Sequence, residues 1–311
     1  MIWRLVLLAP LMLAACGGKP VAVAEPQCPS QPTGEAVLPG GTFTLGAGAL
    51  HGDEGPPRRV TVGPFAIDRT EVTNEAFAAF VAATGYVTLA ERPPDPALYP
   101  GVPREMLKPS SLVFVGAEGL GDGNPANWWR VVEGASWKHP KGPGSDLKGL
   151  GRHPVVHVAY EDALAYARWK GRDLPTEEGW EFAARAGLDG APYEWGEAAK
   201  TPRANTWQGV FPAVDTGQDG YKARTAPVGC FPASAYGLHD LSGNVWEWTS
   251  GRYGPGPDAP RLIKGGSYLC ADNFCLRYRP AARQPGPPDT GQSHLGFRTV
   301  RRGTSVEKGT P

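Results

Sequence analysis

The sequence lacks the features of several large classes of protein. Its 31 Lys and Arg residues balance its 31 Asp and Glu residues, so no net charge favours a nucleic acid partner. Beyond the N-terminus, no apolar run reaches the length of about 20 residues that a membrane-spanning helix needs. No repeat of about 20–50 residues is visible, and the G-x-S-x-G, P-loop and dinucleotide fingerprints are absent. The six histidines show no H-x-x-x-H spacing, so the sequence does not predict a histidine metal centre.

The N-terminus has the pattern of an export signal. Arg4 precedes an apolar stretch over residues 5–13, which is too short to cross a bilayer as a helix. The stretch ends in Leu-Ala-Ala-Cys-Gly at residues 13–17, which resembles the lipobox of bacterial lipoproteins. That resemblance implies a signal peptide over residues 1–15 and a lipidated Cys16. An ordinary signal peptide cut after Ala15, or a buried apolar start, is the alternative.

Residues 16–36 contain the lipobox cysteine and a stretch rich in Pro, Ala, Gln and Gly that has no apolar period. This composition is typical of a flexible tether. The sequence therefore predicts an exported chain that a lipid anchors to the bacterial membrane, facing the periplasm or the cell exterior.

The remaining sequence, about 270 residues, is long enough for one large domain or two small ones. Its 42 Gly, 33 Pro and 10 Trp predict many turns and aromatic packing. Helices are expected over residues 73–83, 160–170 and 176–186, closed by Gly85, Gly171 and Gly187. Strands are expected over residues 42–45, 59–62, 65–68, 155–158 and 297–300. The mixed order predicts an α+β fold with little regular structure, followed by a disordered tail over residues 303–311.

Two cysteines in the C-terminal part, Cys270 and Cys275, lie five residues apart. Unpaired thiols oxidise in an exported chain, so a close pair needs a reason. Two soft thiolates would bind Cu(I) strongly. A disulfide between them is the other interpretation, because exported proteins favour disulfides. The residues alone leave both open.

A family resemblance starts from the same stretch. Residues 265–298 contain G-G-S-Y-x-C-x4-C-x-R-Y-R-x-A-A-R, followed by P-D and L-G-F-R. Further motifs are G-G-T-F at 40–43, E-V-T-N at 71–74, L-P-T-E at 174–177, Y-E-W-G at 193–196, N-T-W-Q-G at 205–209 and G-N-V-W-E-W at 243–248. Together they resemble the formylglycine-generating enzymes, the sulfatase-modifying factors. The resemblance implies a variant of the C-type-lectin-like fold over residues 37–302.

The activity that the resemblance implies is an oxidation. An enzyme of this family converts a cysteine in an unfolded C-x-P-x-R segment of a sulfatase to formylglycine, using O2. Cys270 and Cys275 would hold Cu(I), and the substrate cysteine would be added as a third ligand. Ser267 and Trp246 would line the reactive pocket. The expected partner is thus an unfolded sulfatase polypeptide, and a monomer is expected.

Two structural Ca2+ sites are also implied. Ca2+ takes six to eight oxygen ligands from carboxylates, amides and backbone carbonyls. The first set is the side chains of Asn205 and Asp219 with the carbonyls of Thr206 and Tyr221. The second set is the side chains of Asp240 and Glu247 with the carbonyls of Gly243 and Val245. The alternative is that these Asn and Asp residues bond their own loop backbone.

Several points depart from the family pattern or stay open. Ala271 stands where family members often carry His, so a basic or hydrogen-bonding group is missing beside the thiols. Cys28 and Cys230 match no family position; they either pair, or Cys230 is a small buried apolar residue. The rival functions are a non-catalytic binding module of the same fold in an envelope complex and an oxidase of another thiol substrate.

Overall fold

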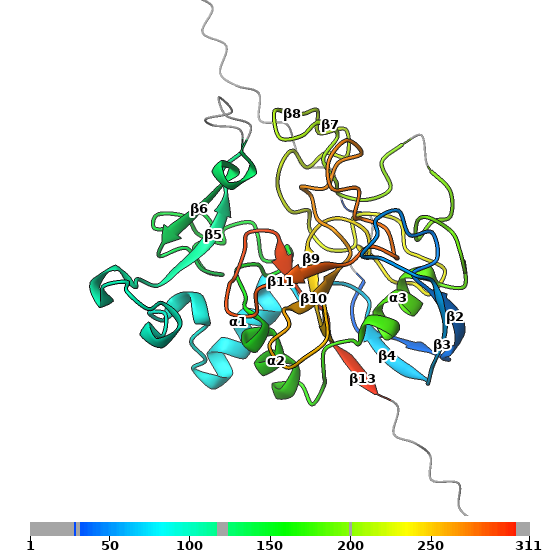
Figure 1. Cartoon of the computed structure of the whole chain (residues 1–311), viewed down its shortest axis with the longest axis horizontal. Helices are drawn as coiled ribbons and strands as arrows, with labels where there is room; N and C mark the ends of the chain where they lie inside the picture. The colour runs from blue at the N-terminus through cyan, green and yellow to red at the C-terminus, as the bar shows by residue number, and fades with distance from the viewer. Residues whose placement is uncertain (1–27, 29–31, 117–123, 199–200, 303–311) are drawn as a thin grey trace, which may run out of the picture.

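The computed structural model describes residues 28, 32–116, 124–198 and 201–302 (Figure 1). The predicted signal peptide, Cys16, most of the predicted tether and the tail over residues 303–311 lie outside these residues. Short helices and strands alternate with long connections, which confirms the α+β expectation. Among the helices of the described ranges, none is both long enough and apolar enough to cross a membrane.

The three predicted α-helices are present. They are α1 (Asn74–Thr84), α2 (Tyr160–Trp169) and α3 (Glu177–Arg185). The Thr73 hydroxyl caps α1 by accepting the amide of Ala76, and Gly85 ends it in the left-handed conformation. Helix α3 ends one residue earlier than predicted, because Ala186 itself adopts the left-handed conformation at φ 45°. Short 3-10 helices span Leu89–Glu91, Pro96–Leu98, Arg104–Met106 and Pro125–Trp128.

The strands form small separate sheets. The sheet of mixed direction has the order β11 (Gln284–Gly286), β10 (Arg261–Lys264), β9 (Trp246–Arg252) and β12 (Leu295–Gly296), in which only β12 runs parallel to its neighbour. An antiparallel sheet joins β1 (Glu35–Leu38), β4 (Phe65–Asp68) and β13 (Val300–Arg302). Pairs are formed by β2 (Gly41–Leu45) with β3 (Arg58–Val62), β5 (Ser110–Phe114) with β6 (Trp129–Glu133), and β7 (Gly209–Val210) with β8 (Val214–Asp215).

Two strand predictions are wrong. Residues 155–158 are not a strand, because His157 adopts φ 61° and breaks the extended backbone. Of the predicted strand over residues 297–300, only Val300 lies in a strand, β13, and residues 297–299 connect β12 to β13. Between those strands Arg298 has no accessible side chain and bonds the carboxylate of Glu247. A long-range ion pair therefore decides the backbone path where local pattern predicted a continuous strand.

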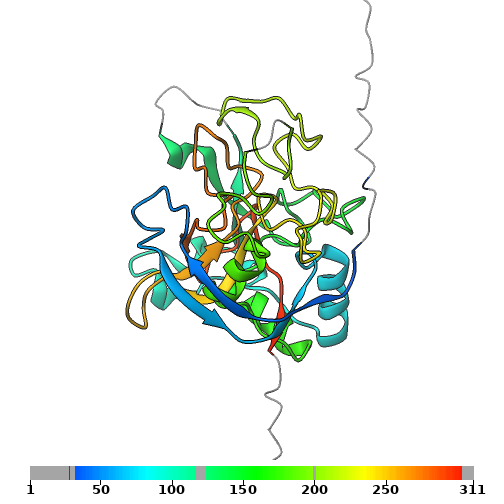
Figure 2. The same cartoon turned by 90° about the vertical axis from the view of Figure 1, so that its right-hand side faces the viewer.

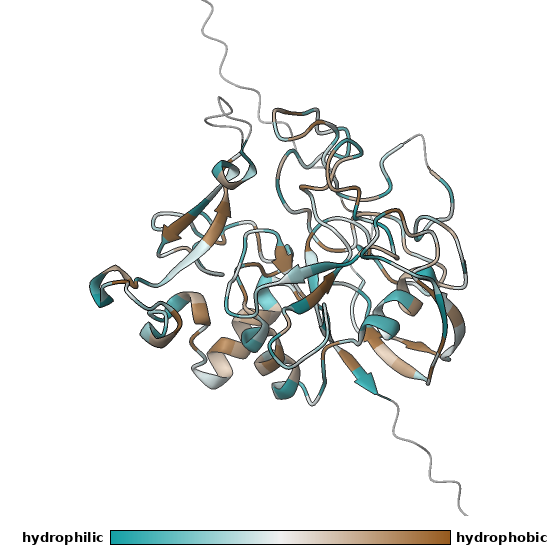
Figure 3. Cartoon of the chain, in the orientation of Figure 1, coloured by the Kyte–Doolittle hydropathy of each residue, from teal (hydrophilic) through white to brown (hydrophobic). Residues whose placement is uncertain are grey.

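The interior consists of separate apolar clusters. One packs α1 and α2 against β9 and contains Phe77, Trp246, Trp248 and Cys270. A second lies between α3 and strands β1 to β4, to the right of α1 and α2 in Figure 1. Hydrophobic and hydrophilic residues are interspersed along the whole chain (Figure 3). Loops make up most of the upper part of the molecule in Figure 2. Such loops must be held by specific contacts, since they lack the regular backbone hydrogen bonds of a helix or sheet.

One of these contacts is a disulfide. Cys28 and Cys230 are bonded across a sequence separation of 202 residues. Of the two interpretations left open for this pair, the structure supports pairing. The bond fixes part of the predicted tether to the domain, and β1 orders its last residues, Glu35 and Ala36. The described residues therefore do not support a tether that extends to residue 36.

Candidate active site at the paired thiols

Cys270 and Cys275 lie on a tight turn that folds the chain back on itself. The amides and carbonyls of Ala271 and Phe274 bond each other at 2.9 and 3.1 Å. Cys275 and Leu276 then take left-handed φ values of 74° and 48°. Both thiols are free, so the disulfide that the residues left open for this pair is not formed. This turn brings two thiol side chains within hydrogen-bonding contact of each other.

The two thiols shift each other's pKa in opposite directions. Burial has the largest single effect on Cys270 and would raise its pKa, but the hydrogen bond with the Cys275 thiol, backbone hydrogen bonds at Ser267 and Arg277 and the charge of Arg277 together lower it. The pKa of Cys275 is raised, chiefly because its proton is held against the Cys270 sulfur. Cys270 is buried, with 2% of its surface exposed, whereas Cys275 is partly accessible. Two adjacent soft sulfurs with one accessible side are a donor set that suits Cu(I).

The two predicted pocket residues lie beside the turn. The Ser267 carbonyl accepts the amide of Cys270 at 2.9 Å, and the serine side chain is fully buried. Trp246 begins β9 and belongs to the same apolar cluster as Cys270. Its backbone amide bonds the carbonyl of His294 at 2.8 Å. The structure thus gathers Ser267, Trp246, Cys270 and Cys275 into one region.

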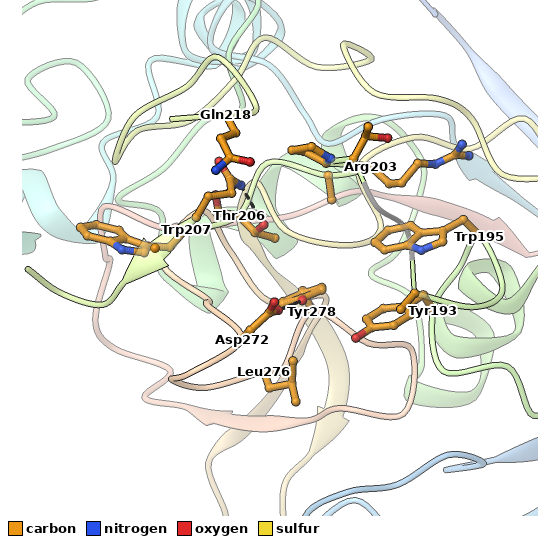
Figure 4. Close-up of a pocket in the computed structure, with 15 residues that line it drawn as sticks. Tyr193, Trp195, Arg203, Thr206, Trp207, Gln218, Asp272, Leu276 and Tyr278 are labelled. Carbon is orange, nitrogen blue, oxygen red and sulfur yellow. Dashed lines mark hydrogen bonds between the residues drawn. The ribbon is translucent and has the colours of Figure 1, made fainter. Parts of the chain in front are cut away.

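A cavity of ≈ 520 Å³ adjoins the turn (Figure 4). Asp272 and Leu276, both on the cysteine turn, contribute to one wall. Tyr278 donates its hydroxyl to Asp272, and its ring stacks on Tyr193 at 5.7 Å. Tyr193 in turn stacks on Trp195 at 5.0 Å. This row of rings braces the cysteine turn from the side of the cavity.

Two histidines near the thiols were missed at the level of sequence. His51, in the connection from β2 to β3, places Nε2 3.2 Å from the carbonyl oxygen of Cys275. His294 places Nδ1 3.4 Å from the Ser267 hydroxyl. Neither has a ligand spacing, and His51 lies 224 positions from Cys275, so no local signal could have found it. The two histidines therefore reach the cysteine turn through a backbone carbonyl and through Ser267.

The structure brings together part of the first predicted Ca2+ ligand set. Asn205 Oδ1 is buried without a hydrogen-bond partner, as expected of an oxygen that could bind a cation. Asp219 accepts the amides of Thr206 and Tyr221 and the side chain of Gln208. A carboxylate accepts about four hydrogen bonds, so Asp219 retains capacity for one more interaction. These residues fit a Ca2+ site at the level of their donor atoms.

The second set fits less well. Asp240 Oδ1 is likewise buried without a partner. Glu247, however, accepts Arg298 on both oxygens at 2.7–2.9 Å and the Trp180 indole at 2.8 Å. Its oxygens are engaged by these donors. Nowhere in the described ranges do three His, Cys, Asp or Glu side chains converge as a metal site, whereas the predicted sets rely largely on carbonyl and amide oxygens.

Further buried carboxylates surround Asp240. Glu71 accepts the Asn244 side chain at 3.0 Å, and its other oxygen has no partner. Burial, with Asp240 and Glu247 nearby, raises the pKa of Glu71 and raises that of Glu194 to about 8. Arg298 is the fully buried cation that faces this group. Nothing in the spacing of Glu71 and Glu194 predicted this cluster, although both lie in the motifs quoted above.

The fold and the site together define a class of protein, a loop-rich α+β domain in which a turn carries two free thiols. The chain matches the family described as "Sulfatase-modifying factor enzyme 1-like domain" over residues 20–303. It therefore belongs to the sulfatase-modifying factor family, as the motifs predicted.

Individual relatives agree with the family match. The chain is 48% identical over 288 residues to the formylglycine-generating enzyme of Mycobacterium tuberculosis, covering 85% of this chain and 96% of the relative. It is also 44% identical over 268 residues to the mouse protein named inactive C-alpha-formylglycine-generating enzyme 2, covering 84% and 83%. The structure of PvdO from Pseudomonas aeruginosa superposes with a TM-score of 0.58 at 25% identity, covering 86% and 94%. Overall identity alone therefore does not separate active from inactive members.

Proposed function

We propose that this protein oxidises a cysteine of a sulfatase C-x-P-x-R segment to formylglycine, using O2 and Cu(I). The observation that carries the proposal is the pair of free thiols, Cys270 and Cys275, in hydrogen-bonding contact on a braced turn. The relatives named as formylglycine-generating enzymes support the same reaction. Bound copper would supply the redox chemistry that activates O2, which protein side chains cannot do alone.

The chain's own residues would perform separate tasks. Cys270 and Cys275 would hold the metal, and the accessible side of Cys275 would admit the substrate thiol. Trp246 and the apolar cluster around Cys270 exclude water from the buried side of the pair. Ser267 supplies a hydroxyl fixed next to Cys270. The tyrosine and tryptophan rings of Figure 4 keep the turn in place.

The test compares metal binding with turnover. The reduced protein should bind about one Cu(I) per chain, far more tightly than Zn2+. Cys270→Ala and Cys275→Ala should each abolish Cu(I) binding and formylglycine formation in a C-x-P-x-R peptide, followed by mass spectrometry. The matched control is Cys28→Ser/Cys230→Ser, which removes two cysteines but leaves the candidate pair. Formylglycine produced by a Cys270→Ala/Cys275→Ala variant would exclude the mechanism.

The rival function is a non-catalytic binding module, because one relative of this chain is named an inactive formylglycine-generating enzyme. A binding module has no need for two free thiols beside a buried serine. If the copper-loaded protein binds the peptide but leaves its cysteine unchanged, the binding module is the correct function. Turnover of small thiols but not of the peptide would instead indicate an oxidase of another thiol.

The calcium sites and the anchor are also proposals. Asn205 and Asp219, with the carbonyls of Thr206 and Tyr221, would hold one Ca2+ and so stabilise loops that lack a large core. Asp240, with the carbonyls of Gly243 and Val245, would contribute to a second, to which Glu247 would bind only by sharing oxygens with Arg298. A lipid on Cys16 would hold the domain near the membrane on the exported side. There a translocated sulfatase would still be unfolded.

A further inference from the structure

We propose that His294 is a positioning residue, whose imidazole accepts the hydroxyl proton of Ser267 and thereby fixes that hydroxyl beside the cysteine turn. The inference rests on the proposed function, because it assigns a task within that site. Nδ1 of His294 lies 3.4 Å from Oγ of Ser267, across 27 residues of sequence. Hydrogen bonds of catalytic groups are often long before substrate binds.

The second ring nitrogen of His294 determines the direction of this bond. Nε2 lies 2.9 Å from the side-chain oxygen of Gln292, which can only accept. Nε2 therefore carries the proton, and Nδ1 presents a lone pair to Ser267. The Ser267 hydroxyl must then be the donor, while its oxygen accepts the amide of Leu269 at 3.2 Å. Its two partners, His294 and the Leu269 amide, together leave the serine hydroxyl a single orientation.

Packing holds the imidazole itself. His294 follows a turn from Gln292 and precedes β12, and its carbonyl accepts the amide of Trp246 at 2.8 Å. The ring of Trp129, from β6, meets the imidazole edge to face with centroids 4.7 Å apart. His294 is only 7% exposed. The histidine is thus clamped between the sheet that bears Trp246 and the β5–β6 hairpin.

A general base is the other role that a histidine could take here, and the structure argues against it. Burial, with His157 nearby, lowers the pKa of His294 to about 3. A free thiol has a pKa of about 8.5, so its proton would move onto this ring only against a pKa difference of more than about five. His294 therefore stays neutral and acts by accepting a hydrogen bond from Ser267.

The experiment compares two substitutions in the copper-loaded protein with a C-x-P-x-R peptide as substrate. His294→Leu removes the acceptor, and we expect kcat to fall about tenfold while KM changes by less than about threefold, since one neutral hydrogen bond is lost. His294→Asn places an amide oxygen near the former Nδ1 and should restore kcat to within about threefold of the wild type. The matched control is His153→Leu, which removes another buried histidine paired to a hydroxyl, that of Thr225. His153→Leu should lower the stability of the protein but leave kcat unchanged.

A second measurement does not depend on turnover or on the folding of the leucine variant. Nitrogen-15 NMR of the imidazole should show His294 protonated on Nε2, and Ser267→Ala should shift the Nδ1 resonance. If the wild type makes no formylglycine, the proposed function fails, while the NMR result still decides the Ser267–His294 bond. Protonation on Nδ1, or an asparagine variant as slow as the leucine variant, would overturn the inference.

Discussion

Removing the Cys28–Cys230 disulfide should destabilise the domain strongly. The bond closes a loop with a sequence separation of 202 residues, and the chain-entropy model gives about 5 kcal/mol for a loop of that length. Measured losses for native disulfides are about 2–5 kcal/mol, because strain and residual structure reduce the effect. We therefore expect Cys28→Ser/Cys230→Ser to lower the free energy of unfolding by about 2–5 kcal/mol. With about 2–4 °C per kcal/mol for a large domain, the Tm should fall by roughly 4–20 °C.

Local packing also holds the segment that carries Cys28. Gly229, at φ 77°, lets Pro32 pack where a side chain would clash, so the N-terminal segment lies against the loop that carries Cys230. The Tyr221 hydroxyl contacts the Cys28 sulfur at 3.4 Å, and the Tyr221 ring meets that of Phe231 edge to face. Without the bond, this segment would have to be ordered by these contacts alone.

The assay is guanidinium unfolding followed by tryptophan fluorescence, on chains that carry Cys16→Ser so that no lipid is attached. The disulfide variant should also show a larger m-value, because an unfolded chain without the cross-link exposes more surface. Cys270→Ser/Cys275→Ser is the control, since it makes the same chemical change without opening a loop; its m-value should stay unchanged. A loss below about 1 kcal/mol, with the m-value unaltered, would refute the reasoning.

Three further predictions concern cations, protons and the anchor. Asp219→Ala should lower the Tm and remove the stabilisation by added Ca2+ at that site; a wild-type Tm that chelation leaves unchanged would show that the calcium assignment is wrong. Because burial raises the pKa of Glu194 from 4.5 to about 8, the folded protein binds a proton that the unfolded chain releases, so stability should fall as pH rises through that window. Glu194→Gln, measured by thermal unfolding in chelator, should flatten that fall, and an unaltered pH profile would contradict the assignment. Cys16→Ser should abolish fatty-acid labelling and detergent partitioning, whereas a wild-type chain that takes up no label would not be a lipoprotein.

Helix positions were predictable because their signals are local. Thr73 and Thr176 cap the helices that follow them, and Gly85 ends the first, since these effects act within one helical turn. Within the candidate site, the spacing of Cys270 and Cys275 drew attention to the pair, and family motifs added Ser267 and Trp246. His51 and His294 were not predicted. Spacing alone left the Cys270–Cys275 pair open between a disulfide and a metal site.

Pairings across long stretches of chain were beyond sequence reasoning. The five cysteines permit many pairings, and only packing showed that Cys28 meets Cys230 while the other described cysteines stay reduced. The predicted strand over residues 297–300 failed for the same reason. Arg298 is buried against Glu247, which lies 51 residues away in the sequence. Only the folded chain forms this ion pair, so no local sequence pattern could predict it.

The sequence by itself determined which side chains are available for chemistry: two close cysteines, a serine three residues before them, and motifs that place them in a family. The tertiary structure decided how those groups are presented. It placed His294 against Ser267, His51 against the Cys275 carbonyl and the stacked rings of Tyr193 and Tyr278 against the turn. Hydrogen bonds and ring contacts act over a few ångströms, whereas these partners are far apart in sequence, so only the folded chain brings them together.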